Sequence, residues 1–180
     1  MTPKRVFISA DHGLAVVYFL QSDVLPNLLS AGLEVVLLTD DGLKQQIAER
    51  FGQPGLIVEG LRFAECRRYF DQYAHSMQYW LHFLRWMGGS DRINTHAMDG
   101  HLRQMGYEAS PRAKLFMPLV RLAVRRLRRS AGARRWLMQQ QMAFVPGLYA
   151  DLFEKYQPQL VIASTPGWRW DRYLLREAAQ

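Results

Sequence analysis

The residues best suited to chemistry follow the first predicted strand. The run Arg5–Ser9 is short, β-branched and aromatic, and Asp11 and His12 come directly after it. A parallel sheet binds its ligands outside the carboxyl ends of its strands. A neutral imidazole there can act as a general base toward a hydroxyl group. We therefore take His12 as the candidate general base, with Asp11 beside it, and the alternative is that His12 only caps the following helix.

A second polar loop follows the last predicted strand, Gln159–Ala163. Its hydroxyl groups and the first amides of the next helix are suited to an anionic or hydroxylated ligand. A plain capped turn explains the same pattern equally well. The positions that we assign to substrate binding are Gly13, Ser164, Thr165 and Gly167.

Other polar clusters give weaker signals. Asp40 and Asp41 follow a further predicted strand, where an acidic side chain can bind a ribose but more often caps the next helix, and we favour the cap. Neither of the two histidine pairs has the spacing of metal ligands, so we expect no metal site. The pairs are His75 with His82 and His96 with His101.

The excess positive charge of the chain belongs to one segment. The chain has 23 basic and 16 acidic residues, a net charge of +7, yet no acidic residue lies between Glu108 and Asp151. Nine basic residues fall in that gap, so the remainder of the chain has a net charge of −2. Any argument for an anionic partner therefore concerns this segment.

Part of the basic segment predicts an amphipathic helix. Its apolar face consists of Phe116, Leu119, Val120, Ala123 and Leu127. The arginines that fall largely opposite are Arg121, Arg125, Arg128 and Arg129. A basic amphipathic helix suits an anionic membrane surface, and we assign these arginines to that role. The structural alternative is that the arginines are simply solvated, while the apolar face packs in the protein. Nucleic acid is the less favoured partner. Pro118 argues against one long straight helix.

Composition and missing motifs exclude several classes of protein. The chain is 49% hydrophobic and 22% charged, as globular proteins are, and its single cysteine, Cys66, excludes an intrachain disulfide. The loop Ser9–Ala15 has one glycine, too few for a dinucleotide-binding fingerprint, and no P-loop, nucleophile elbow or zinc-protease motif occurs. The longest clean apolar run, Leu14–Leu20, is far shorter than the roughly 20 residues of a membrane span. We expect no cofactor in this chain.

Strands and helices alternate at both ends of the sequence. The predicted strands are Arg5–Ser9, Leu33–Thr39, Gly55–Glu59 and Gln159–Ala163. The first helix begins either at Ser22 and Asp23, with Pro26 in its first turn, or near Gly13, with a kink at Pro26. Residues 61–156 show no convincing strand and predict a helical insertion.

These elements predict an α/β fold. We expect an incomplete Rossmann-like parallel sheet of about four strands with a large helical insertion, forming a single domain over residues 1–180. The strand Gln159–Ala163 should lie beside Arg5–Ser9, which leaves its far edge open to self-association. The sequence ends inside a predicted helix without a stop signal, so we expect the N-terminal domain of a longer protein.

Both ends of the chain resemble a known enzyme family. Val6–Gly13, Ser22–Pro26 and Gly32–Val36 are similar to the amino-terminal half of the GT-B glycosyltransferases, and Tyr156–Gly167 and Leu174–Ala178 match it as well. The similarity is greatest to bacterial surface-polysaccharide and CDP-glycerol-transferase-like members. It covers about the first 60 and the last 25 residues.

The resemblance implies the acceptor-side domain of a glycosyltransferase-like protein. Such a protein moves a sugar or glycerol-phosphate group from a nucleotide-activated donor to a membrane-associated or cell-surface polysaccharide acceptor. In one branch of the family a histidine after the first strand deprotonates the acceptor, and His12 occupies that position. The supporting aspartate of that branch has no counterpart where Ser164 and Thr165 stand, and Asp171 lies further on.

The resemblance also implies partners and a location. A C-terminal domain, missing from this chain, would bind the nucleotide-sugar donor, and the chain would lie in the cytoplasm at the inner face of the membrane. Two alternatives remain open. One is a non-catalytic α/β module whose basic helix binds a membrane surface or nucleic acid, and the other is a domain like those of nucleotide-sugar 2-epimerases, which share the fold.

Overall fold

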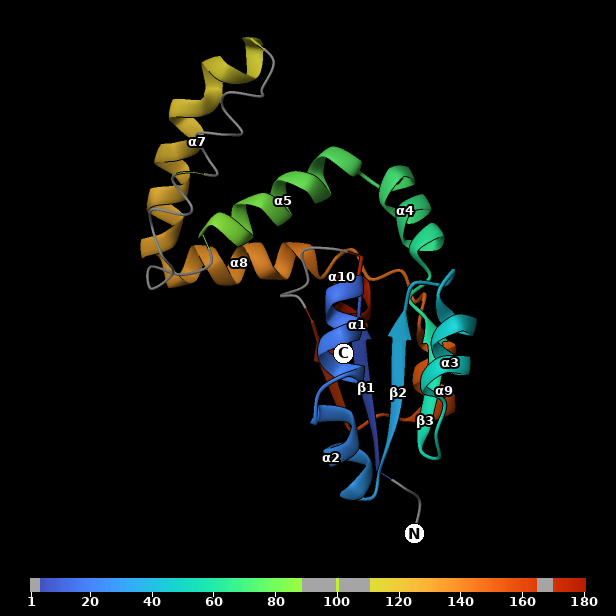
Figure 1. The fold of residues 1–180 in the computed structure, drawn as a ribbon. Coiled ribbons are helices and arrows are strands. Elements are labelled where there is room, and N and C mark those ends of the chain that lie inside the picture. The colour runs from blue at the N-terminus through green and yellow to red at the C-terminus, as the bar shows by residue number, and fades with distance from the viewer. Residues whose placement is uncertain (1–3, 89–99, 101–110, 165–169) are drawn as a thin grey trace. The chain divides into compact units, whose positions relative to one another are not determined.

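The computed structural model describes residues 4–88, 100, 111–164 and 170–180 (Figure 1). The chain divides into two compact units. Met1–Tyr73 together with Val145–Gln180 forms one unit, which we call the sheet domain, and Ala74–Phe144 forms the other, which we call the helical unit. The sheet domain thus includes both flanks of the segment 61–156 that the sequence predicts as a helical insertion.

The elements alternate in the order expected of an α/β protein. The strands are β1 (Lys4–Ala10), β2 (Leu33–Thr39), β3 (Leu56–Gly60) and β4 (Leu160–Ala163). The helices of the sheet domain are α1 (Gly13–Leu20), α2 (Val24–Ser30), α3 (Lys44–Phe51), α4 (Phe63–Gln72), α9 (Ala150–Tyr156) and α10 (Arg172–Glu177). The helices of the helical unit are α5 (His75–Gly88), α7 (Pro111–Arg129) and α8 (Ala131–Gln141).

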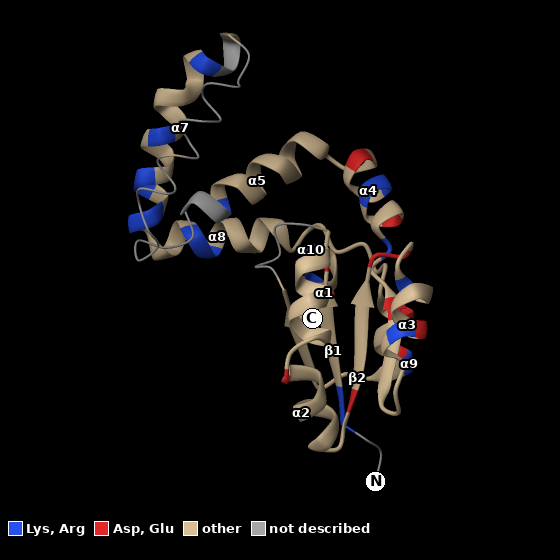
Figure 2. Cartoon of the chain, in the orientation of Figure 1, with Lys and Arg blue, Asp and Glu red and all other residues tan. Residues whose placement is uncertain are grey.

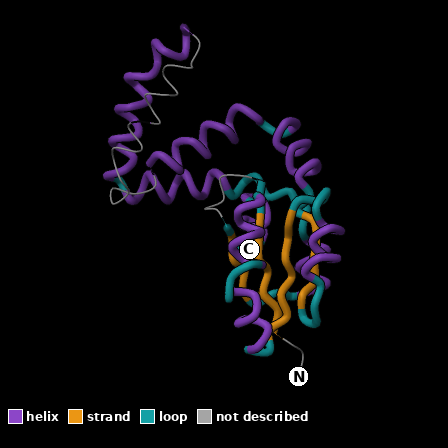
Figure 3. Tube along the Cα trace, in the orientation of Figure 1, coloured by secondary structure: helices purple, strands orange, loops and turns teal. Residues whose placement is uncertain are grey.

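The four strands form one parallel sheet in the order β3-β2-β1-β4. Figure 3 shows the strands lying side by side, with helices around them. The predicted α/β fold and the predicted pairing of the last strand with the first are therefore confirmed. The chain runs outward from β1 through β2 to β3, and then returns to the other side of β1 to form β4. The order of strands reverses between β1 and β4, and the gap between these two strands is the topological switch point of the sheet.

The sequence left open whether the first helix begins near Gly13 or at Ser22 and Asp23, and the connection from β1 to β2 contains a helix at each place. It contains two short helices, α1 and α2, with a break at residues 21–23. At the break the Ser22 hydroxyl donates to the Tyr18 carbonyl and accepts from the Val24 amide at 3.3 Å. Pro26 lies in the first turn of α2, where its missing N–H costs no helical hydrogen bond.

Both faces of the sheet are buried, as the apolar runs in its strands require. On one face, Val35 and Leu37 of β2 pack in a cluster with residues of the neighbouring strand and helices, which include Val6, Ile8, Ala15, Leu25 and Ile47. On the other face, the ring of Phe7 lies 5.4 Å from that of Phe153 and 6.0 Å from that of Tyr156, both in α9. Helices on both faces hold the sheet as a rigid base for its carboxyl-end loops.

Polar contacts tie the end of β3 to the segment that leads into α9. Arg62, two residues after the end of β3, forms two hydrogen bonds with the Asp151 carboxylate, at 2.6 and 2.8 Å. Both carboxylate oxygens of Glu177 accept backbone amides, those of Leu148 and Tyr149, at 2.8 Å. These contacts join the end of β3 and the end of α10 to the segment with which the chain re-enters the sheet domain.

A buried pair of side chains completes this junction. The Tyr149 hydroxyl donates to the carbonyl of Leu61 at 2.5 Å, and it lies 3.4 Å from the Cys66 sulfur. Burial raises the pKa of the Cys66 thiol to about 11, and burial likewise raises the pKa of the Tyr149 hydroxyl. Both groups stay protonated in the folded protein under conditions in which an exposed thiol ionises.

The helical unit has its own small core. Phe83 of α5 and Val124 of α7 are buried against each other, and Met117 and Val120 of α7 pack around them. α7 continues through Pro118 without interruption. Within the described parts of the chain, no helix is both long and apolar enough to cross a membrane.

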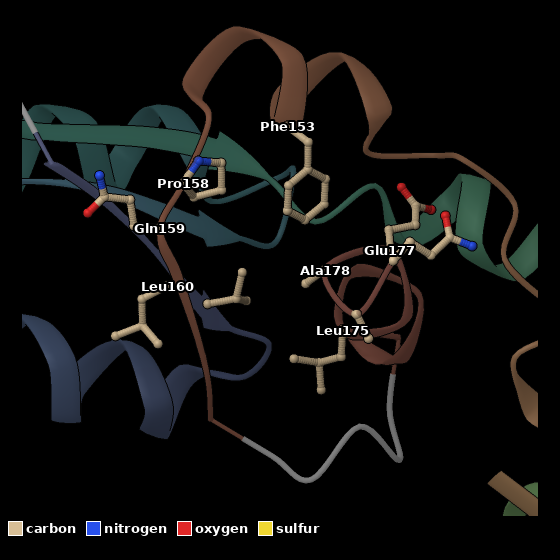
Figure 4. Close-up of a pocket in the computed structure, with 10 residues that line it drawn as sticks. Phe153, Pro158, Gln159, Leu160, Leu175, Glu177 and Ala178 are labelled. Carbon is tan, nitrogen blue, oxygen red and sulfur yellow. The ribbon is translucent and has the colours of Figure 1, made fainter. Parts of the chain in front are cut away.

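The outer edge of β4 remains open in the described structure. β4 is the last strand of the sheet on its side, and Leu160 at its start is 53% exposed. A groove of about 570 Å³ runs between this strand, Phe153 and the end of α10, where Leu175 and Ala178 line it (Figure 4). An unpaired strand beside an apolar groove favours pairing with a further strand.

The buried thiol predicts a loss of stability at alkaline pH. An unfolded chain loses the Cys66 proton near pH 9.0, whereas the folded protein keeps it to about 11, so the free energy of unfolding falls as the pH rises between these values. At about pH 10 the thiol alone should cost about 1.4 kcal/mol. Urea unfolding near neutral pH and near pH 10 measures the loss. Cys66→Ala should lose less over the same interval, and an equal loss would contradict the burial of the thiol.

The open edge predicts self-association. We expect wild-type protein to form dimers or larger species as its concentration rises, and Leu160→Lys to weaken this association, because an exposed edge lysine opposes strand pairing. Analytical ultracentrifugation over a concentration series measures it. Leu14→Lys, at a residue of α1 that is 55% exposed, is the matched control and should associate like wild type. A wild-type protein that stays monomeric at high concentration would contradict the prediction.

Candidate functional site

Asp11 and Ser164 meet at the switch point of the sheet. Ser164 directly follows β4, and its amide donates to the Ser9 carbonyl of β1 at 3.0 Å. Its hydroxyl donates to Oδ1 of Asp11 at 2.8 Å and accepts from the Asp11 amide at 3.5 Å. The Asp11 side chain is fully buried. Two residues 153 positions apart in the sequence thus form one polar contact at the carboxyl ends of neighbouring strands.

His12 lies beside this pair and remains accessible. It adopts an extended backbone conformation directly before α1, and its carbonyl accepts the amides of Ala15 and Val16. The side chain is 33% exposed, and Nδ1 lies 3.1 Å from Oδ1 of Asp11. This contact is electrostatic, because Nδ1 forms no hydrogen bond within the described residues.

The position of the carboxylate distinguishes the two ring nitrogens of His12. Nδ1 is buried and faces Asp11, so a proton on Nδ1 is the arrangement that suits the neighbouring negative charge. Nε2 is then the nitrogen that can meet a ligand, and its lone pair can accept a proton from a hydroxyl group. The alternative role, that of a helix cap, is served by the backbone alone, since the His12 side chain forms no capping hydrogen bond.

The other substrate-binding positions divide into two groups. Gly13 is exposed at the first turn of α1, and an added Cβ would meet no atom within 4 Å. A side chain there is therefore tolerated by the protein, so that any need for glycine would come from a ligand. Thr165 and Gly167 lie outside the described residues, as do His96 and His101.

Asp40 and Asp41 have structural partners, although neither caps α3. Oδ1 of Asp40 accepts the Gly42 amide at 2.9 Å and closes the turn after β2. Oδ2 of Asp41 accepts the amide of Phe63 at 3.1 Å, so it caps α4, a helix one strand further along the chain. An added Cβ at Gly60 would lie 2.0 Å from Oδ1 of Asp41, so a side chain there would displace the Asp41 carboxylate from its present position.

Two buried hydroxyl groups at the carboxyl-end edge of the sheet, near Asp11, were not predicted from the sequence. Ser9 and Thr39 are fully buried, and within the described residues Oγ of Ser9 and Oγ1 of Thr39 have no hydrogen-bond partner. Thr39 pairs in register with Ala10, one residue before Asp11. The only sequence signal for them is a hydroxyl residue at the carboxyl end of an otherwise apolar strand.

The four arginines assigned to a membrane surface do not share one environment. Arg121, Arg125 and Arg129 are exposed on α7. Figure 2 shows that basic positions recur along this helix and that no acidic position interrupts them. Arg128 is buried, at 9% exposure. It follows the buried Val124 by one helical turn, so it lies on the side of α7 that packs in the helical unit. Only the other three arginines are available to a partner.

Comparisons of the chain with protein-family models, with curated proteins and with solved structures found no match. The family resemblance drawn from the sequence therefore stays a hypothesis. The α/β fold with its four-strand parallel sheet is established by the structure itself.

The contact between Ser164 and Asp11 predicts a measurable contribution to stability. Ser164→Ala removes a hydrogen-bond donor from a buried carboxylate, and it should lower the free energy of unfolding by about 1–3 kcal/mol. Ser30→Ala is the matched control, because the Ser30 hydroxyl donates to the Asn27 carbonyl at an exposed position of α2. The control should change stability by less than about 0.5 kcal/mol. Equal effects in urea unfolding would contradict the buried contact.

Proposed function

We propose that the sheet domain is the acceptor-side domain of a glycosyltransferase-like protein, in which His12 removes a proton from an acceptor hydroxyl group. The acceptor is a hydroxyl-rich chain, such as a membrane-associated or cell-surface polysaccharide. The group transferred is a sugar or a glycerol phosphate, supplied by a nucleotide-activated donor on a separate donor-binding domain. The fold alone would also suit other activities, so the proposal depends on the site.

One observation carries the proposal. The partly exposed imidazole of His12 and the hydrogen-bonded pair of Asp11 and Ser164 come together at the topological switch point between β1 and β4. In open α/β sheets this is where ligands bind, because the loops on either side diverge and leave a crevice. A titratable ring held there by a buried carboxylate is suited to proton transfer.

The proposed step uses each of the three side chains. The lone pair of Nε2 of His12 takes the proton of the acceptor hydroxyl, whose oxygen then attacks the activated carbon or phosphorus of the donor. The bond from that atom to the nucleotide phosphate breaks, and the nucleotide leaves with the electron pair. The negative charge of Asp11 favours a proton on Nδ1 of His12, and Ser164 holds the Asp11 carboxylate through its 2.8 Å hydrogen bond.

Ligand titration monitored by NMR of the histidine ring protons tests the proposal. The probes are a short poly(glycerol phosphate), a neutral oligosaccharide, and the nucleotides CDP and UDP. We expect one of the first two probes to shift the His12 resonances and to bind at least tenfold more weakly to His12→Asn. His75→Asn, which changes an exposed histidine of α5, is the matched control and should bind like wild type.

The competing hypotheses give different results. Binding of CDP or UDP at His12, without binding of an acceptor probe, would favour a domain like those of nucleotide-sugar 2-epimerases and contradict an acceptor site. If no probe moves the His12 resonances, the sheet domain is better explained as a non-catalytic module.

A further inference from the structure

We infer that the outward side of α7 binds the surface of an anionic lipid bilayer. Three leucines on this side, Leu115, Leu119 and Leu122, are 76%, 63% and 54% exposed, and we call them the leucine ridge. Their spacing of four and three residues places them one above another along one side of the helix. The inference stands on the helical unit and does not depend on the proposed role of His12.

The leucine ridge is not part of the core of the helical unit. The core stripe of α7 consists of Met117, Val120 and Val124, which pack with Phe83 of α5. The apolar face expected from the sequence is therefore wrong in part, because Phe116 and Leu119 are 58% and 63% exposed. Val124 follows Leu122 by two residues, about 200° around the helix, so the ridge faces away from the core. The helix therefore has two apolar stripes, of which only one is covered by the described residues of the helical unit. Contiguous exposed apolar side chains of this kind mark interaction sites.

Arginines continue the ridge toward the C-terminal end of α7. Arg126 follows Leu122 by four residues and Arg129 follows it by seven, so both lie on the same side of the helix as the leucines, and both are exposed. Arg125, three residues after Leu122, is exposed beside them. One side of α7 is therefore apolar along its middle and cationic at its end. At an anionic bilayer, the leucines would enter the boundary of the acyl chains and the arginines would bind the lipid phosphates.

The positive charge of the helical unit favours an anionic bilayer over a second copy of the chain or nucleic acid as the partner of this surface. The helical unit has twelve basic and three acidic residues, a net charge of +9, and neither α7 nor α8 contains an acidic residue. A second copy docked through this side would bring two such charges together. Nucleic acid would attract the arginines but would leave the leucine ridge in water. An anionic bilayer offers phosphates and hydrocarbon at the same surface.

Vesicle flotation with the full chain tests the inference. Vesicles of phosphatidylcholine alone are compared with vesicles of equal parts phosphatidylcholine and phosphatidylglycerol, at low and at high salt. We expect binding to the anionic vesicles only, and weaker binding at high salt because salt screens the arginines. A wild-type protein that ignores the anionic vesicles would overturn the inference.

Two variants separate the two parts of the surface. The ridge variant carries Leu115→Gln, Leu119→Gln and Leu122→Gln, and the charge variant carries Arg125→Gln, Arg126→Gln and Arg129→Gln. Each should bind anionic vesicles at least tenfold more weakly. The matched controls lie in the sheet domain and should bind like wild type. They are Leu14→Gln with Val17→Gln, both exposed on α1, and Arg50→Gln with Arg67→Gln and Arg68→Gln, which removes three exposed positive charges.

Measuring how deeply residue 119 enters the bilayer tests the inference even if the ridge variant or the charge variant unfolds. A bimane fluorophore on Leu119→Cys, in a Cys66→Ala background, should shift to the blue on anionic vesicles and be quenched by nitroxides on the lipid chains. The same fluorophore on Gln140→Cys, an exposed position of α8, should not respond. If the ridge variant binds like wild type, or if the fluorophore at residue 119 stays in water, the leucines do not enter the bilayer and the inference fails.

Discussion

The pairing of β4 with β1 is the interaction on which the candidate site depends. The chain leaves the sheet domain after β3 and returns after the whole helical unit before it forms β4. The entropy cost of closing so long a loop grows only with the logarithm of its length, so a few good contacts offset the extra length. The bonds of Arg62 with Asp151 and of Tyr149 with Leu61 are such contacts. The return places Ser164 against Asp11 and creates the switch point.

The parts of this arrangement that follow local patterns could be predicted from the sequence. The apolar run of β2 identifies a strand buried on both faces, and the doubly wound order places the last strand beside the first. The contacts that hold the return could not be predicted, because Tyr149 and Leu61 are 88 residues apart and no periodicity links them. Asp41 shows the same limit. Its position indicates a cap, but only the three-dimensional fold determines that it caps α4.

At the candidate site, the position of a residue in the fold could be predicted from the sequence, but its burial could not. The loop positions of Asp11 and His12 followed from the end of β1, but the burial of one side chain and the partial exposure of the other depend on what packs around them. In the proposed function, this difference gives the two residues separate roles. A carboxylate that water cannot reach orients a ring, and a ring that remains accessible can exchange a proton with a ligand.

The charges of α7 explain how an exposed apolar stripe is compatible with a protein in water. Leucines that face solvent favour association between copies, yet the exposed arginines on the same side of the helix are not balanced by any acidic residue in α7 or α8. Two copies meeting through this side would therefore repel each other, while the same charges attract an anionic surface. The sheet domain lacks this protection, because its net charge is only −2 and its open strand β4 carries no charged residue. Self-association through β4 is thus expected to depend little on salt, whereas surface binding through α7 should weaken as salt screens the attraction to phosphates.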